Sequence, residues 1–237
     1  YLGQDLEILF GANGDANGDD YPVQIRPFAK DAALKDRLEE LVIEGNGGGQ
    51  KTETYELNAL YYARKVEMPN ATRKPILIFI GDESPYSYVD KDYAKDLMGI
   101  ILSGRLSTIQ LFEELKEKYA VYLISKKYEK TSGDEVSEIN SRIYNDWVKL
   151  LGADHISILP KAERVVDVIF AILAKETDRV GYFRKEIEGR QKAEQVDMVY
   201  KSVESIHRAL PPDAKNEDFG KSITKIGSGK KSKRLLE

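Results

Sequence analysis

The sequence predicts an α/β fold in which a doubly wound, mostly parallel sheet is flanked by helices. Three short apolar segments predict strands, and each is followed by residues with apolar side chains at helical spacing. The first segment, 76–80, is continuous and apolar, follows Pro75 and stops at Gly81, which is typical of a buried parallel strand. The other two predicted strands are 121–125 and 155–159.

Helices are predicted between and after these strands, where apolar residues recur every three or four positions. Their stripes cover 106–115, 136–150 and 165–173. Before the first apolar strand we expect a short edge strand over 23–28, because it alternates and contains Pro27. A helix capped by Asp31 and a second helix beginning near Tyr55 complete that part.

The pattern divides the chain into three parts. We expect an α/β domain over 1–178, a helical extension over 179–212 with one helix at about 186–210, and a basic, disordered tail over 213–237. The chain begins at Tyr1 with apolar residues at helical spacing and no helix start signal. We therefore expect the natural N-terminus to be missing, together with any targeting segment.

Composition excludes several classes of function. The 237 residues contain no cysteine and two histidines, which excludes thiolate sites and argues against a histidine-rich zinc centre. The formal net charge of -4 argues against nucleic acid as the partner. No apolar run is long enough to cross a bilayer, so we expect no membrane partner and a cytoplasmic location.

Three polar loops are expected at the carboxyl edge of the predicted sheet, where ligands of such folds bind. Their side chains offer carboxylates and hydroxyls, which suit Mg²⁺ or Mn²⁺. The candidate metal ligands are Asp15 in a turn cluster after a short strand expected to end near Ala12, Thr52 in a glycine-rich loop, and Asp82 after the apolar strand. The candidate supporting or partner-binding residues are Gln50, Glu53, Glu83 and Ser84.

These loops resemble those of a von Willebrand factor A domain of the bacterial type, a Rossmann-like fold. In that family the metal-ion-dependent adhesion site has a first loop with D-x-S/T-x-S, a glycine-rich second loop presenting Thr, and a third presenting Asp after a buried strand. The 47–53 loop resembles the second, although Thr52 lies one place later than the family pattern, and 76–83 resembles the third. Gly14-Asp15 resembles the end of the family's second strand, and the resemblance covers about residues 1–178.

One family element is missing. No D-x-S/T-x-S pattern occurs in the chain, and by the family's order it would precede Tyr1. The resemblance thus implies an N-terminally incomplete domain that lacks the central strand. Its implied function is non-catalytic binding of another protein, whose acidic side chain completes the coordination of the metal.

Two alternatives remain open. Asp15, Asp82 and Glu83 could hold the metal of a hydrolase acting on phosphate or nucleotide substrates. The chain could also be a metal-free scaffold, because the first loop is missing. Neither a phosphate-binding G-x-x-x-x-G-K-[ST] loop nor a G-x-S-x-G nucleophile motif occurs.

Overall fold

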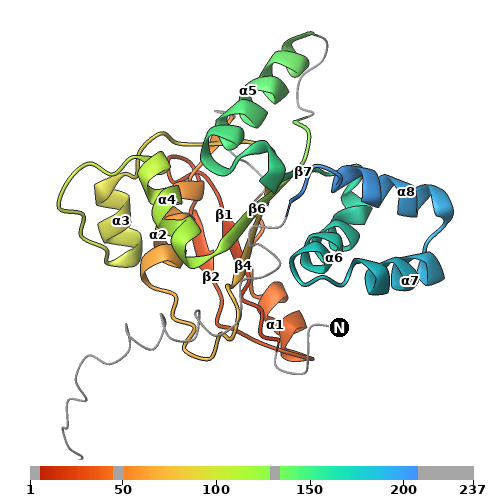
Figure 1. Ribbon diagram of the computed structural model, residues 1–237. Coiled ribbons are helices and arrows are strands. Elements are labelled where there is room, and N and C mark those ends of the chain that lie inside the picture. Colours follow the sequence, from red (N-terminus) through yellow and green to blue (C-terminus); the bar gives the residue numbers. More distant parts are fainter. Residues whose placement is uncertain (1–5, 45–50, 129–133, 208–237) are drawn as a thin grey trace, which may run out of the picture.

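The computed structural model describes residues 6–44, 51–128 and 134–207 (Figure 1). Its centre is a three-stranded parallel sheet in the order β4-β6-β7. The strands are β4 (Ile76–Gly81), β6 (Ala120–Ser125) and β7 (Ile156–Ile158). The predicted α/β class with parallel strands is therefore confirmed, although this sheet is small.

Strand β6 is the central and most buried strand. All six of its residues are buried, as expected for a parallel strand that is covered on both faces. Strand β4 pairs with β6 from Ile76–Ala120 to Gly81–Ser125. The expectation that β4 is fully buried is wrong: it pairs with β6 alone among the described strands, and the side chain of Ile80 is 45% exposed.

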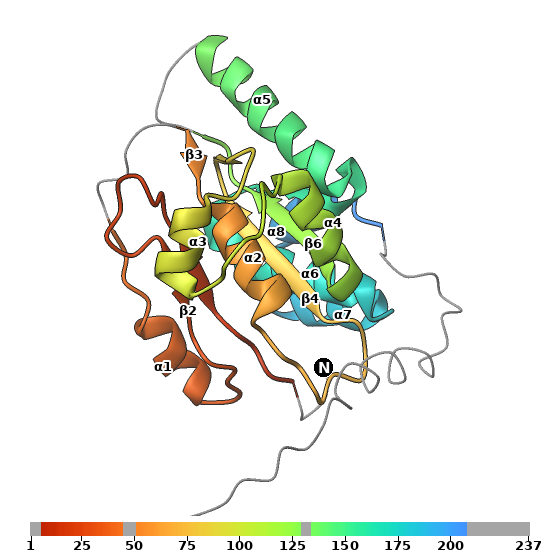
Figure 2. The same ribbon diagram turned by 90° about the vertical axis from the view of Figure 1, so that its left-hand side faces the viewer.

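Successive residues of β6 point to opposite faces of the sheet, so two separate cores form. Val121 and Leu123 belong to the larger core, whereas Tyr122 and Ile124 belong to the smaller one. Four helices contribute buried residues to the larger core (Figure 2). These helices are α2 (Tyr55–Arg64), α3 (Lys91–Met98), α4 (Thr108–Lys118) and α5 (Asp134–Leu151).

The smaller core is covered by the last three described helices (Figure 1). They are α6 (Val165–Glu176), α7 (Val180–Arg190) and α8 (Ala193–Ser202). The expectation of one helix over 186–210 is wrong, because Gln191 and Lys192 are extended and separate α7 from α8. The break allows Ile187 and Val199, on different helices, to be fully buried in the same core.

The buried carboxylate of Asp167 stabilises the junction between α6 and α7. It lies 3.1 Å from Nη1 of Arg164 and 2.8 Å from Nη1 of Arg190. A buried charge is tolerated when ion pairs and hydrogen bonds compensate for the water that it has lost. The segment after residue 178 is consequently joined to the sheet by a shared core and by an ion-pair cluster.

The N-terminal part adds two small sheets and one helix. Strand β1 (Gly11–Asn13) pairs antiparallel with β2 (Val23–Ile25), and β3 (Thr52–Glu53) pairs parallel with β5 (Ser84–Pro85). Helix α1 (Ala33–Glu39) lies between β2 and β3 in the chain. Asp31 does not cap it, contrary to expectation: Ala32 occupies the cap position and Asp31 has a φ of 52°.

Among the residues that the structure describes, every helix is too short or too polar to cross a bilayer. The predicted tail over 213–237 lies outside the described residues.

Candidate functional site

The pairing of β3 with β5 brings two of the three predicted loops together. Thr52 lies opposite Ser84, and Glu53 lies opposite Pro85. The Ser84 N–H also donates a hydrogen bond to the Lys51 carbonyl oxygen, at 3.4 Å. The described end of the glycine-rich loop, at Thr52, and the loop after β4, at Ser84, therefore lie side by side.

The third predicted loop joins them through Thr54. Both the N–H and the hydroxyl of Thr54 donate hydrogen bonds to the Gly14 carbonyl oxygen, at 3.1 and 2.5 Å. The Tyr86 hydroxyl, just beyond β5, lies 3.0 and 3.1 Å from the two carboxylate oxygens of Asp15. Asp15, Thr52 and the 82–84 segment thus belong to one polar region, which we call the acidic edge.

Asp15 is buried within this edge, with an exposure of only 2%. Its Oδ1 accepts hydrogen bonds from the N–H and the Nδ2 of Asn17, at 3.0 and 2.9 Å, as well as from Tyr86. Such side-chain-to-backbone bonds are typical of Asp in a tight turn. The contacts show Asp15 fixing the loop, while its predicted role as a metal ligand stays a prediction.

Glu53 carries the strongest electrostatic perturbation of the edge. Burial, followed by the nearby carboxylates of Glu83, Asp19, Asp15 and Asp82, raises the pKa of its carboxyl group to about 8. Its Oε2 is buried without a hydrogen-bond partner among the described residues. Several carboxyl groups therefore lie close together at the edge, and Glu53 holds its proton more tightly than an ordinary glutamate does.

Asp82 lies at the more accessible end of the acidic edge. Its side chain is one third exposed, and its Oδ2 lies 3.4 Å from Nζ of Lys126, which follows β6. At this distance and exposure the ion pair is weak, so the lysine can be displaced by another cation. Asp82 is therefore the predicted ligand that solvent and a partner can reach most easily.

The two residues after Asp82 turn into the protein. The Ser84 hydroxyl donates a hydrogen bond to Oδ2 of Asp146, at 3.0 Å, and the Trp147 ring N–H donates one to the Glu83 carbonyl oxygen, at 2.9 Å. Glu83 and Ser84 are both buried. Helix α5 therefore holds the loop after β4 through these two contacts.

Gly81 is required where β4 ends because another side chain occupies the space of a Cβ atom. A Cβ atom built on Gly81 would lie 1.9 Å from the hydroxyl oxygen of Tyr55. Burial raises the pKa of Tyr55 above its ordinary value, and the carboxylates of Glu53, Asp82 and Glu83 act in the same direction. The neutral phenol group of Tyr55 therefore lies between the loop after β4 and the larger core.

Sequence reasoning missed two residues that organise the site, Glu56 and Tyr86. Glu56 lies in the first turn of α2, is 1% exposed and accepts a hydrogen bond from the Tyr86 N–H, at 3.2 Å. Burial raises the pKa of Glu56 to about 8. The one sequence signal for Glu56 is that it is acidic while its neighbours in the first turn of α2 are buried. Helical periodicity alone does not assign a role to such a residue.

The described residues of the acidic edge fit a metal site only in part. Within residues 6–44, 51–128 and 134–207, no three Asp, Glu or His side chains are arranged to hold a metal ion together. Gln50, the remaining predicted site residue, lies outside the described residues. The described edge thus offers one or two carboxylates at a time, with hydroxyl groups beside them.

Comparison of this chain with protein families, with characterised proteins and with solved structures finds no match in any of the three.

Proposed function

We propose that this chain is a non-catalytic protein-binding module that holds Mg²⁺ or Mn²⁺ at the acidic edge. In this proposal an acidic side chain of another protein completes the coordination of the metal. The fold would be of the von Willebrand factor A type, and the location cytoplasmic. The proposal extends the sequence resemblance with the contacts described above.

The observation that carries the proposal is the environment of Glu53. Its Oε2 is buried without a described hydrogen-bond partner, and burial together with four nearby carboxylates raises the pKa of Glu53 to about 8. A buried acceptor of this kind costs free energy unless a donor or a cation reaches it. A divalent cation would supply the missing positive charge and would favour the ionised carboxylate.

Three residues would hold the cation, and Glu53 among them replaces Asp15, whose carboxylate already accepts hydrogen bonds from Asn17 and Tyr86. Asp82 offers an accessible carboxylate, Thr52 a hydroxyl group on the neighbouring strand, and Glu53 the buried oxygen. Magnesium usually takes only one or two protein carboxylates and keeps several waters. That preference agrees with an edge at which three described carboxylates do not converge, and it leaves coordination positions for a partner.

The other residues of the edge would position these three. Asp15 and Tyr86 fix the first loop against β5, while Asp146 and Trp147 hold the third loop on α5. The exposed carboxylate of a partner would bind the cation directly. A desolvated charge contact of this kind, placed at the centre of an interface, is typical of a hot spot for binding.

The test is a calorimetric titration of Mn²⁺ and Mg²⁺ into the chain and into Asp82→Asn and Glu53→Gln. Asp36→Asn, an exposed aspartate on α1, is the matched control. We expect one cation per wild-type chain, at least about tenfold weaker binding in the two site variants, and no change in the control. Affinity should increase as the pH rises through about 8, because the cation displaces the proton of Glu53.

Each contrary outcome points to a named alternative. No binding to the wild-type chain between about pH 7 and about pH 9 would refute the proposal and favour the metal-free scaffold. Equal affinity in all variants would place the cation elsewhere. Metal-dependent turnover of a generic phosphodiester or nucleotide, lost in Asp82→Asn, would favour the hydrolase instead.

A further inference from the structure

A second polar region lies at the carboxyl ends of β6 and β7, and it is basic. A pocket of about 430 Å³ lies there, between the residues that follow these two strands and helix α8. Its basic residues are Lys126, Lys127, Lys161 and Lys201. In an open α/β sheet, the carboxyl ends of parallel strands are where small ligands bind.

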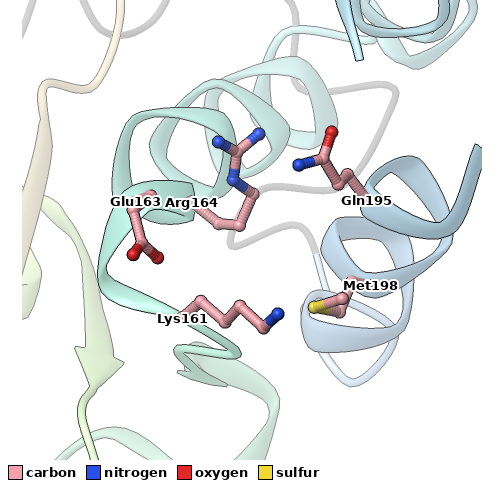
Figure 3. A pocket seen from close by; sticks show the side chains of 5 residues that line it. All are labelled: Lys161, Glu163, Arg164, Gln195 and Met198. Carbon is pink, nitrogen blue, oxygen red and sulfur yellow. The ribbon is translucent and has the colours of Figure 1, made fainter. Parts of the chain in front are cut away.

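A smaller pocket of about 300 Å³ shares Lys161 and Met198 with the first. Figure 3 shows Lys161 and Arg164 on one side of this pocket, with Gln195 and Met198 facing them from α8. Because they share two lining residues, the two pockets adjoin. We call them together the basic pocket.

The charge of the larger part is not compensated by its own walls. Four lysines line it and no carboxylate does. Lys126 has the ion pair with Asp82, at 3.4 Å, whereas no described carboxylate lies within ion-pairing distance of Lys127, Lys161 or Lys201. Several like charges around one hollow produce a positive potential that attracts an anion.

The walls between the lysines are apolar. Ile158, Leu159, Pro160 and Met198 contribute them, and Ile158 is left 38% exposed at the mouth. The volume lies within the range of ordinary small-molecule sites and exceeds what a bare phosphate ion needs. The pocket therefore matches a ligand with an anionic group and an organic part, better than it matches a simple ion.

We propose that the basic pocket binds a small organic phosphate. The ammonium groups of Lys127, Lys161 and Lys201 donate hydrogen bonds to the phosphate oxygens, and the organic part packs on Leu159 and Met198. Lysine suits this role because it acts as a mobile point charge toward phosphate. The site uses no residue proposed to hold the metal, so the two proposals can fail separately.

The test is calorimetry with ADP, glucose 6-phosphate, inorganic phosphate and adenosine, in buffer with a chelator to exclude the metal. The double variant Lys161→Ala/Lys201→Ala removes two pocket charges, and Lys95→Ala/Lys185→Ala removes two exposed lysines elsewhere. We expect an organic phosphate to bind more tightly than inorganic phosphate, and adenosine not to bind. Affinity should decrease at least about tenfold in the pocket variant, remain unchanged in the control, and weaken as ionic strength rises.

The comparison of ADP with glucose 6-phosphate identifies the organic part. A second variant, Met198→Ala, should weaken the organic phosphate while leaving inorganic phosphate unchanged, because it removes an apolar wall and no charge. The proposal is overturned if neither organic phosphate binds at millimolar concentration, or if the pocket variant binds as well as the wild type. It is also overturned if an oligo-glutamate peptide binds while both organic phosphates do not, which would make the region a protein-docking surface.

Discussion

Glu56 provides a test of the folded structure that does not depend on any ligand. Its carboxyl group is almost fully buried in the first turn of α2, and burial raises its pKa from 4.5 to about 8. A carboxyl group of this kind holds its proton more tightly in the folded chain than in the unfolded chain. Its contribution to stability is complete below about pH 4.5 and is lost as the pH rises through about 8.

The magnitude follows from proton linkage. With these two pKa values, the free energy of unfolding should decrease by about 2–3 kcal/mol between about pH 5 and about pH 7. Glu53 contributes in the same direction, but by less than its pKa suggests, because its partial exposure lets solvent screen the charge. A loss of this size is a large fraction of the stability of an ordinary domain.

The assay is urea unfolding at about pH 5, 6, 7 and 8 for the wild type and for Glu56→Gln. The glutamine amide stays neutral and can still accept the hydrogen bond from the Tyr86 N–H, so the variant should lose most of the pH dependence. Glu113→Gln, at a side chain that is 71% exposed, is the control and should keep it. If Glu56→Gln and the wild type lose stability in parallel, the buried acid does not titrate as described and the reasoning fails.

Three further substitutions test packing and polar contacts. Gly81→Ala should destabilise the chain by about 1–3 kcal/mol in urea unfolding, because the new Cβ would overlap the Tyr55 hydroxyl group. Adding Tyr55→Phe to this variant should recover part of the lost stability. If no stability is recovered, the contact between the two positions is contradicted. Asp167→Ala should lower the free energy of unfolding by about 3 kcal/mol, because Arg190 loses its buried ion-pair partner. The variant should also be cleaved by proteases at the α6–α7 junction. A junction that stays resistant to proteolysis would refute this role of Asp167. Lys118→Ala should lower the free energy of unfolding by about 1–3 kcal/mol, because the ammonium group donates hydrogen bonds to three carbonyl oxygens at and just after the end of α2. Unchanged amide hydrogen exchange in that segment would contradict this prediction.

The strands that form the central sheet were predictable because each is an apolar run bounded by turn residues. The two-residue strands β3 and β5 were not, since so short a segment shows no alternation, and only tertiary contacts pair Thr52 with Ser84. Helix α3 was missed because most of its side chains are polar. Its ends carried a signal nonetheless: Asp90 accepts hydrogen bonds from two backbone N–H groups, and Gly99 ends the helix with a φ of 64°.

The candidate site shows the same division. The position after a strand predicts Asp82 as a site residue, the glycine-rich loop predicts Thr52 and Glu53, and these roles stay predictions. The sequence does not indicate that Asp15 is held by Tyr86, since the two residues are 71 positions apart. The basic pocket was missed for the same reason, because its lysines come from the ends of two strands and from α8.

The position of Trp147 has a practical consequence. It is the only tryptophan of the chain, and its ring N–H is bonded to the Glu83 carbonyl oxygen in the loop after β4. The indole also packs edge-on against Tyr55, at 5.1 Å between ring centroids. Intrinsic fluorescence excited at the indole therefore comes from a single position beside the acidic edge. The unlabelled chain carries its own optical reporter for any cation or partner that moves this loop.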